Sequence, residues 1–240
     1  MPEHAPNSEG NEIQFGSYHV RRESMSTSET IAIDKQMEHS IPVFTEILEI
    51  CRERILAGEY QTIIGEDASG RIPAQIMHKT LREIYRALGY ESPQIVFLAG
   101  THRASLENQT ANWETKLELV ENILEQHRGR FAVVTDTIRT GENIGFLCEA
   151  MDRADAEYDI ITTRLEGAKH IPHLVELSKG NSVNFYQYPE ANGVKKDPNN
   201  VFAHRADTSN RNIMEYYRAK IKETAEVLAK QFLGEIGING

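Results

Sequence analysis

The chain has 240 residues, of which 40 % are hydrophobic and 26 % charged, a composition typical of a soluble globular protein with a substantial core. Its 26 basic and 36 acidic residues give a formal net charge of −10, which argues against nonspecific binding to nucleic acid or to anionic membranes. No apolar run approaches the roughly 18 residues of a membrane span, and the polar start does not resemble a signal peptide, so we expect a cytoplasmic protein.

The first part of the chain is polar up to about residue 38, and we expect a mobile tail there. A helix is predicted from Ile41, with Pro42 in its first turn and Gly58 at its stop. Apolar residues follow one another at the three- and four-residue spacing of a helix: Phe44, Ile47, Leu48, Cys51 and Ile55. The second cysteine, Cys148, also lies in a helical pattern, so both cysteines are predicted to be buried free thiols.

A first strand at residues 62–64 precedes a small, glycine-bearing loop at 66–71 and a long helix that ends near Gly89, with Pro73 in the first turn of that helix. A junction of this kind presents backbone N–H groups to an anion. The ordinary alternative is that Arg71 pairs with Glu66 or Asp67 and the loop only turns the chain.

A second strand is predicted at residues 94–99, and Gly100, Thr101, His102 and Arg103 follow it. The basic pair of His102 and Arg103 faces either a ligand or solvent. Residues 104–114 have no clear period, and we expect Trp113 among them to be a packing anchor.

The third strand, residues 131–134, carries the most informative stretch of the sequence. After Asp136 the side chains become small or polar, and a helical pattern begins at Ile144. Gly141 allows close approach or a positive φ, Thr140 adds a hydroxyl and Arg139 a charge, so a phosphate fits the helix start, while Asp136 suits the hydroxyls of a sugar. The ordinary alternative is that Asp136 and Thr140 cap the turn and the helix.

The rest of the chain continues the alternation of strands and helices. We expect a fourth strand at residues 158–162, a short helix at 171–177, a fifth strand at 183–186, a turn-rich loop at 188–198 and an amphipathic helix at 212–233. This rhythm predicts an α/β fold with a parallel, possibly mixed, sheet of about five strands, helices on both faces, and helical N- and C-terminal extensions. Ligands of such sheets bind at the carboxyl ends of the strands, where all three loops fall.

The stretch from Val133 to Gly141 resembles the phosphoribosyl pyrophosphate (PRPP) signature of the type I phosphoribosyltransferases: an apolar strand, two acidic residues, three variable residues, then Thr-Gly. One acid of the pair is absent. Either Thr135 and Asp136 fill the two places, as the spacing to Thr140 favours, or Asp136 and Thr137 do. The resemblance covers roughly residues 60 to 165.

The resemblance implies roles for particular residues. It implies that Asp136 holds the ribose hydroxyls and, indirectly, the metal ion, and that Arg103 acts with it in catalysis. It further implies that the 5′-phosphate lies at the loop after the third strand and the diphosphate at the loops after the first two. The substrate-binding residues it implies are Ser69, Gly70, Arg71, His102, Thr137, Arg139, Thr140, Gly141, Glu142 and Asn143.

The function implied by the resemblance is transfer of a phosphoribosyl group from PRPP, with Mg²⁺, to a nitrogenous acceptor, a glycosyltransferase reaction of nucleotide metabolism. The alternative is a non-catalytic module that senses PRPP or a nucleoside phosphate. We divide the chain into a tail (1–38), an α/β domain (39–205) and a C-terminal helix (206–240) that packs on the domain or between subunits of a homodimer. The expected partner is a small molecule, neither nucleic acid nor membrane.

Overall fold

A computed structural model describes residues 26–98, 110–127, 129–167, 171–178, 180–185, 194–195, 204–205 and 211–238. Its centre is a five-stranded sheet in the order β2-β1-β3-β4-β5, in which every pair is parallel. The strands are β1 (Tyr60–Glu66), β2 (Gln94–Leu98), β3 (Arg130–Ile138), β4 (Tyr158–Leu165) and β5 (Leu174–Val175). The expected α/β class and strand number are confirmed.

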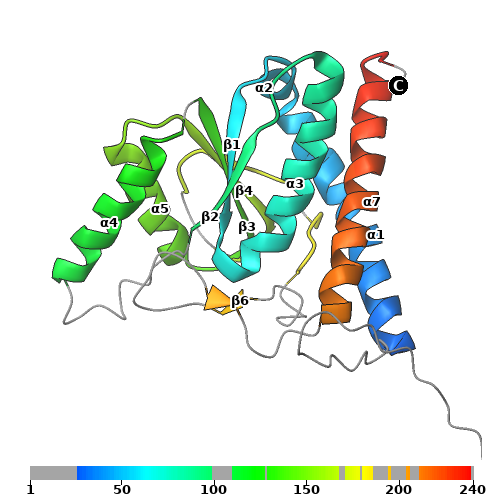
Figure 1. The fold of residues 1–240 in the computed structure, drawn as a ribbon, viewed down its shortest axis with the longest axis horizontal. Helices are drawn as coiled ribbons and strands as arrows, with labels where there is room; N and C mark the ends of the chain where they lie inside the picture. The colour runs from blue at the N-terminus through cyan, green and yellow to red at the C-terminus, as the bar shows by residue number, and fades with distance from the viewer. Residues whose placement is uncertain are drawn as a thin grey trace, which may run out of the picture.

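Helices cover both faces of the sheet (Figure 1). On one face lie α1 (Thr27–Ile50), α3 (Asp67–Leu88) and α7 (Arg211–Glu235), and on the other lie α4 (Thr110–Leu124) and α5 (Glu142–Arg153). The helix α2 (Arg52–Leu56) and the two-stranded pair of β6 (Val194–Lys195) and β7 (His204–Arg205) complete the described elements. No described helix has the length and apolar character needed to span a bilayer.

The alternation of side chains along β3 divides the core between these layers. Ala132 and Val134 belong to the cluster with α1, α3 and α7, whereas Phe131 and Val133 belong to the cluster with α4 and α5. Successive residues of a strand point to opposite faces, so a strand buried on both sides needs a continuous apolar run. This is why the sequence of β3 identified a central strand.

The N-terminal helix begins earlier than the sequence predicted. Ser26 is its N-cap, and a reciprocal capping box joins Ser26 to Glu29, so the helix includes residues 27–38 that we expected in the tail. Pro42 is therefore an interior residue and not a first-turn residue. A Ser-x-x-Glu signal was present in the sequence, but few apolar residues follow it before Ile41.

The expected loop at residues 66–71 was wrong. The strand β1 extends to Glu66, and Asp67 is already the first residue of α3, so Ser69, Gly70 and Arg71 lie in the opening turns of a helix. Pro73 consequently falls in the second turn. The strand β3 is also longer than predicted and includes Asp136 and Thr137.

The later elements combine confirmations and corrections. The predicted C-terminal helix is confirmed as α7, and Trp113 packs edge-to-face on Phe146 with ring centroids 4.9 Å apart, as expected of a packing anchor. However, residues 110–114 belong to α4 and not to an irregular loop. The expected helix at 171–177 contains β5, and residues 183–185 form no strand, although the Val183 N–H donates to the Thr163 carbonyl at 2.9 Å.

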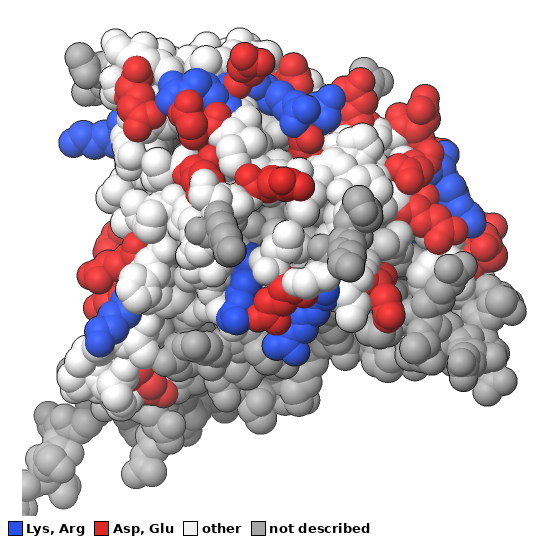
Figure 2. Space-filling view, turned by 180° about the vertical axis from the view of Figure 1, so that it is seen from behind, with Lys and Arg blue, Asp and Glu red and all other residues white. Residues whose placement is uncertain are grey.

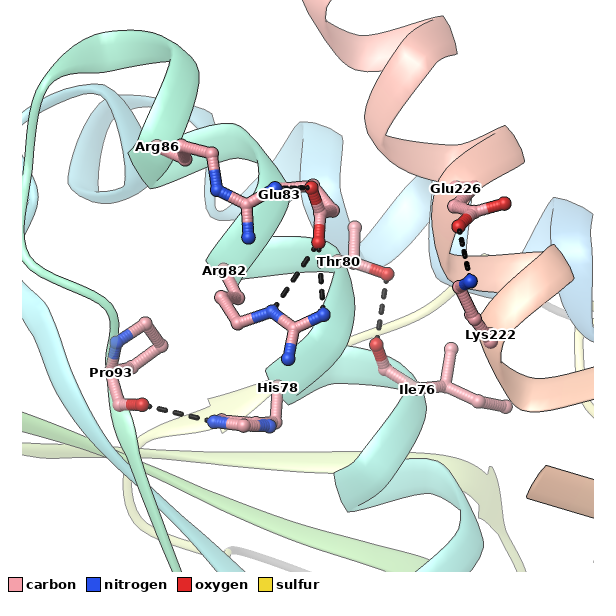
Figure 3. Close-up of polar contacts among 9 residues, drawn as sticks. All are labelled: Ile76, His78, Thr80, Arg82, Glu83, Arg86, Pro93, Lys222 and Glu226. Atoms are coloured by element: carbon pink, nitrogen blue, oxygen red, sulfur yellow. Dashed lines mark hydrogen bonds and ion pairs between the residues drawn. The ribbon is translucent and has the colours of Figure 1, made fainter. Parts of the chain in front are cut away.

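Short-range polar contacts follow α3 along its length (Figure 3). The Thr80 hydroxyl donates to the Ile76 carbonyl at 2.9 Å, and Nε2 of His78 lies 3.0 Å from the Pro93 carbonyl just before β2. Glu83 accepts from Arg82 and Arg86, and the neighbouring α7 carries the Lys222–Glu226 pair. These contacts lie away from the N-terminus of α3, which remains directed at the carboxyl edge of the sheet.

Both cysteines are buried free thiols, as predicted. Burial raises the pKa of Cys51 to about 11 and also raises that of Cys148. Neither thiol is therefore an activated nucleophile.

Candidate functional site

The strand order reverses direction between β1 and β3. The helix that follows β1 lies on the face with α1 and α7, whereas the helix that follows β3 lies on the opposite face with α4. The two connections therefore leave the sheet in opposite directions, a topology for which a ligand crevice is expected at the carboxyl ends of the two strands. In open α/β sheets this is the usual place for a ligand.

The first turns of α3 press directly on β3 at this point. A Cβ atom on Gly70 would lie 2.5 Å from the carbonyl oxygen of Val134 and 3.2 Å from the Cα of Thr135. Only glycine permits this approach, and the backbone conformation of Gly70 is an ordinary helical one. The N-terminus of α3, with its unpaired N–H groups, is thereby held beside the end of β3.

A buried hydrogen bond joins the two strands where β1 ends. The register pairs Gly65 with Val134, and the next residues, Glu66 and Thr135, face each other through their side chains. The Thr135 hydroxyl donates to Oε2 of Glu66 at 2.6 Å, and the two residues are only 1 % and 4 % exposed. Glu66 thus places a carboxylate at the boundary of β1 and β3.

Asp136 lies on the other face of β3 from Thr135 and is 2 % exposed. Its backbone carbonyl accepts from the hydroxyls of Thr163 at 2.8 Å and Thr162 at 3.3 Å, both on β4. Because β1 ends at Glu66, β3 from Asp136 onward has no paired residue of β1 beside it. Within the described chain, the buried hydroxyl oxygen of Thr137 has no hydrogen-bond partner.

The start of α5 contains the glycine and hydroxyl expected of a phosphate loop, and the same residues also cap the helix. Gly141 is the N-cap with φ +81°, a left-handed conformation that favours glycine, as the sequence suggested. The Thr140 hydroxyl accepts from the Glu142 N–H at 3.4 Å, in keeping with the capping alternative. Arg139 is largely exposed and pairs with Glu166 at 2.8 Å, so part of its charge is already balanced.

The remaining predicted site residues are placed only in part. Arg71 lies with its guanidinium carbon 4.0 Å from the ring centre of Phe97, on β2 and beside the crevice. Ser69 and Asn143 occupy the first turns of α3 and α5. His102 and Arg103 lie outside the described residues, as does most of the 104–114 segment. The structure therefore places Gly70 against β3 at Val134 and Thr135, with Asp136 and Thr137 following in the same strand and Thr140 and Gly141 just beyond its end.

Two surface hollows border these elements. One, of about 540 Å³, extends along α5 from Thr140 and Gly141 past Cys148 to Arg153, with Ile171 and Pro172 at its side. The other, of about 550 Å³, lies at the amino ends of the strands, where the linings include Glu59, Glu125, Asp155 and Glu157. Helix C-termini and carboxylates make the second hollow unfavourable for an anion.

Charged side chains of both signs gather at the amino ends of the strands. Figure 2 shows acidic and basic side chains interleaved near the top of the molecule, toward the amino ends of the strands. There Arg130 lies 3.3 Å from Glu59, 3.1 Å from Glu157 and 3.5 Å from Asp159. Those cations are balanced locally, so the amino end offers little net positive potential to a phosphorylated ligand.

The described residues include no group of three or more acidic, histidine or cysteine side chains suited to a metal ion. Mg²⁺ is commonly held by one or two carboxylates together with substrate phosphates and water. Glu66 and Asp136 are buried carboxylates near the carboxyl ends of β1 and β3, but they project from opposite faces of the sheet.

Glu66 is the residue of the crevice that sequence reasoning undervalued. Its position one residue after an apolar strand was visible, but it was assigned to a loop, whereas it is the last residue of β1 and the N-cap of α3. Thr162 and Thr163, which bind the backbone of Asp136, were missed because the predicted fourth strand ended at residue 162.

The fold defines the chain as a doubly wound, parallel α/β protein whose strand order reverses between β1 and β3. Searches of family models, curated proteins and solved structures found no match to the chain.

Proposed function

We propose that the chain binds PRPP with Mg²⁺ in the crevice between β1 and β3 and transfers its phosphoribosyl group to a nitrogenous acceptor. The observation that carries the proposal is the position of Asp136. The residue that the PRPP signature assigns to the sugar hydroxyls is buried at the carboxyl end of β3, next to the N-terminus of α3 and the strand-order reversal.

The two helix starts divide the ligand between them. The N–H groups of the first turn of α5, with Gly141 in a left-handed conformation, suit the 5′-phosphate. The first turn of α3 suits the diphosphate, and the carboxylate of Asp136 accepts hydrogen bonds from the ribose hydroxyls between them. Mg²⁺ bound with the diphosphate would neutralise part of its charge, with Asp136 acting on the ion indirectly, through the ribose hydroxyls or water.

The reaction breaks the bond between C1 of the ribose and the diphosphate oxygen and forms a bond from C1 to the acceptor nitrogen, whose proton passes to solvent. The protein contributes mainly by position and by donors aimed at the departing diphosphate.

One observation favours a second candidate function, a PRPP-sensing module without transfer. Thr135 stands where the signature has an acid, and its hydroxyl is engaged with Glu66 at 2.6 Å. Binding of the sugar phosphate is compatible with this arrangement, whereas catalysis in related sites is associated with the complete acidic pair.

Calorimetry with PRPP in the presence of Mg²⁺ tests the binding. We expect the wild type to bind and Asp136→Asn to bind about tenfold more weakly or worse, as loss of a charge-assisted hydrogen bond predicts. The matched control is Asp155→Asn, the same change at an exposed left-handed position at the amino end of the sheet. Absence of binding by the wild type contradicts both candidate functions. Diphosphate release with a panel of nitrogenous bases then separates transferase from sensor.

A further inference from the structure

We propose that Arg139 and Arg164 bind the phosphate monoester of the ligand, and that the carboxylate of Glu166, which lies between them, is an internal competitor that the phosphate displaces. The inference rests on the proposed function, because the monoester is one end of the proposed ligand. Neither Arg164 nor Glu166 is among the residues that the resemblance implies for that end.

Two arginines share one carboxylate at the carboxyl edge of the sheet. Nε of Arg139 lies 2.8 Å from Oε2 of Glu166, and Nη2 of Arg164 lies 2.5 Å from Oε1. The arginine side chains are 77 % and 39 % exposed, so a solute can reach both guanidinium groups. Each guanidinium uses one nitrogen on Glu166 and keeps further N–H donors for a ligand. The cluster therefore has an excess of positive charge in a chain whose net charge is −10.

The backbone of β3 and β4 fixes the place of this cluster. The register pairs Thr137 with Arg164 and Ile138 with Leu165, and the Glu166 N–H donates to the Ile138 carbonyl at 2.7 Å. Paired residues of adjacent strands lie side by side and point to the same face. Arg164 thus lies beside Thr137, whose buried hydroxyl oxygen has no hydrogen-bond partner among the described residues.

The cluster also lies next to the start of α5. Arg139 directly precedes Thr140 and Gly141, and Gly141 is the N-cap of α5. The hollow of about 540 Å³ begins at these two residues. The first turn of a helix attracts an anion, so its N–H groups add to the attraction of the arginines. The donors of the cluster and of the helix therefore lie around the same end of β3.

A phosphate monoester competes well with the carboxylate of Glu166. Exposed ion pairs contribute little to stability, because water and salt screen them, so breaking these two contacts costs little. At about pH 7.5 a monoester carries up to about two negative charges and three acceptor oxygens, since its second pKa is about 6. Arginine matches phosphate geometry bidentately. Removal of the competing charge of Glu166 should consequently strengthen phosphate binding.

A similar cluster on α3 shows what ordinary surface pairing looks like. Glu83 lies 3.0 Å from Arg82 and 2.5 Å from Arg86 (Figure 3). These residues lie within the helix, where backbone N–H groups are already bonded along the helix. If the contacts of Glu166 are only surface ion pairs of this kind, removing either carboxylate leaves phosphate binding unchanged. Glu83 is therefore a matched control for Glu166.

Calorimetry with ribose 5-phosphate in EDTA, at about pH 7.5, tests the site without metal or diphosphate. We expect Glu166→Gln to raise the affinity by about threefold, the scale of one exposed ion pair. Arg139→Gln and Arg164→Gln should each lower the affinity by about tenfold, as loss of a charge-assisted contact predicts.

The controls repeat these changes on α3. Glu83→Gln and Arg86→Gln should stay within about twofold of the wild type, because distant exposed charges are screened. Thermal melting confirms that each variant is folded. Arg164→Lys keeps the charge but loses the planar fork, so its affinity should lie between those of Arg164→Gln and the wild type.

Inorganic phosphate is titrated in parallel to identify the class of ligand. Weaker binding of inorganic phosphate than of ribose 5-phosphate, with the same dependence on both arginines, supports a monoester site. Tighter binding of inorganic phosphate contradicts that assignment.

The outcomes separate the inference from the proposed function. Unchanged binding of ribose 5-phosphate by Arg164→Gln overturns the inference, and so does weaker binding by Glu166→Gln, which would mean that Glu166 orients the arginines for the ligand. The inference also fails if neither the wild type nor Glu166→Gln binds ribose 5-phosphate. If the expected pattern is found but PRPP with Mg²⁺ does not bind, the proposed function fails while the phosphate site stands.

Discussion

His78 shows how the burial of one side chain links stability to pH. The ring is partly buried under the start of β2, and this burial lowers its pKa below the ordinary value of 6.5, although the contact with the Pro93 carbonyl at 3.0 Å acts in the opposite direction. Nearby Arg82 and Lys79 add to the lowering. The folded state therefore resists protonation of this ring.

The consequence for stability has a definite sign. Below pH 6.5 the unfolded chain binds a proton at His78 that the folded chain does not, so the free energy of unfolding falls as the pH decreases toward the folded pKa. We expect His78→Gln, whose amide can donate to the same carbonyl, to lose less stability between pH 7.5 and 5.5 than the wild type. Urea denaturation at both values measures this, and parallel losses in the two proteins would contradict it.

At the scale of elements, the seating of α3 on β3 depends on one glycine. Because a Cβ on Gly70 would lie 2.5 Å from the Val134 carbonyl, Gly70→Ala must displace the first turn of α3 from the strand. We expect a loss of about 1–3 kcal/mol in the free energy of unfolding, the usual cost of overpacking. Under the proposed function, PRPP affinity falls as well, because the same turn faces the crevice.

The matched control is a second helical glycine. Gly145 in α5 has no atom within 4 Å of a Cβ added to it, apart from its own helix, and its φ is not positive. Gly145→Ala should therefore leave stability unchanged or raise it by up to about 1 kcal/mol. Equal denaturation midpoints for Gly70→Ala and the wild type would show that α3 is not fixed by this contact.

At the scale of the whole molecule, Asp159 joins several elements at the amino edge of the sheet. This buried carboxylate on β4 accepts from the Tyr60 hydroxyl of β1 at 2.8 Å and pairs with Arg54 of α2 at 2.6 Å and Arg130 of β3 at 3.5 Å. Burial raises the pKa of Tyr60, so its phenol remains a neutral donor. The cluster holds these elements together at the amino edge of the sheet, opposite to the proposed ligand site.

We expect Asp159→Asn to lower the free energy of unfolding by about 2 kcal/mol, less than a fully buried pair would cost because Arg54 is partly exposed. Glu157→Gln is the control, since Glu157 is exposed and pairs with Arg130 only at the surface, and it should change stability by no more than about 0.5 kcal/mol. Urea denaturation measures both, and equal effects would mean that burial of Asp159 contributes nothing. Ligand binding by either variant should be unchanged.

The sequence predicted β3 and α5 more accurately than it predicted the start of α3 and the short strand β5. The continuous apolar run of residues 131–134 and the helical spacing after Ile144 identified β3 and α5, because burial on both faces of a strand and on one face of a helix leaves a clear period. The start of α3 was missed because Ser69 and Gly70 favour loops by local propensity, whereas contact with β3 stabilises the helix there. Residues 174–175 were missed since so short a strand has no readable period.

The crevice itself was predicted only in outline. Parallel strands with their loops at one edge follow from the alternation of patterns, but the pairing of Glu66 with Thr135 depends on the register of two strands separated by about 70 residues in sequence. Local patterns do not contain that register. Asp136 was proposed from its motif, whereas the contact between Glu66 and Thr135 required the structure.

The pairing of α1 with α7 has a consequence for synthesis of the chain. Tyr217 of α7 donates to Gln36 of α1 at 2.6 Å, Tyr216 donates to Asp34 at 2.9 Å, and apolar side chains of both helices enter the same core cluster. The ribosome makes α1 first and α7 last, so Ile33 and Met37 stay without their partners while nearly all of the intervening chain is translated. A nascent chain that stalls before residue 211 would expose Ile33 and Met37. Chaperones that bind apolar surfaces would recognise these side chains.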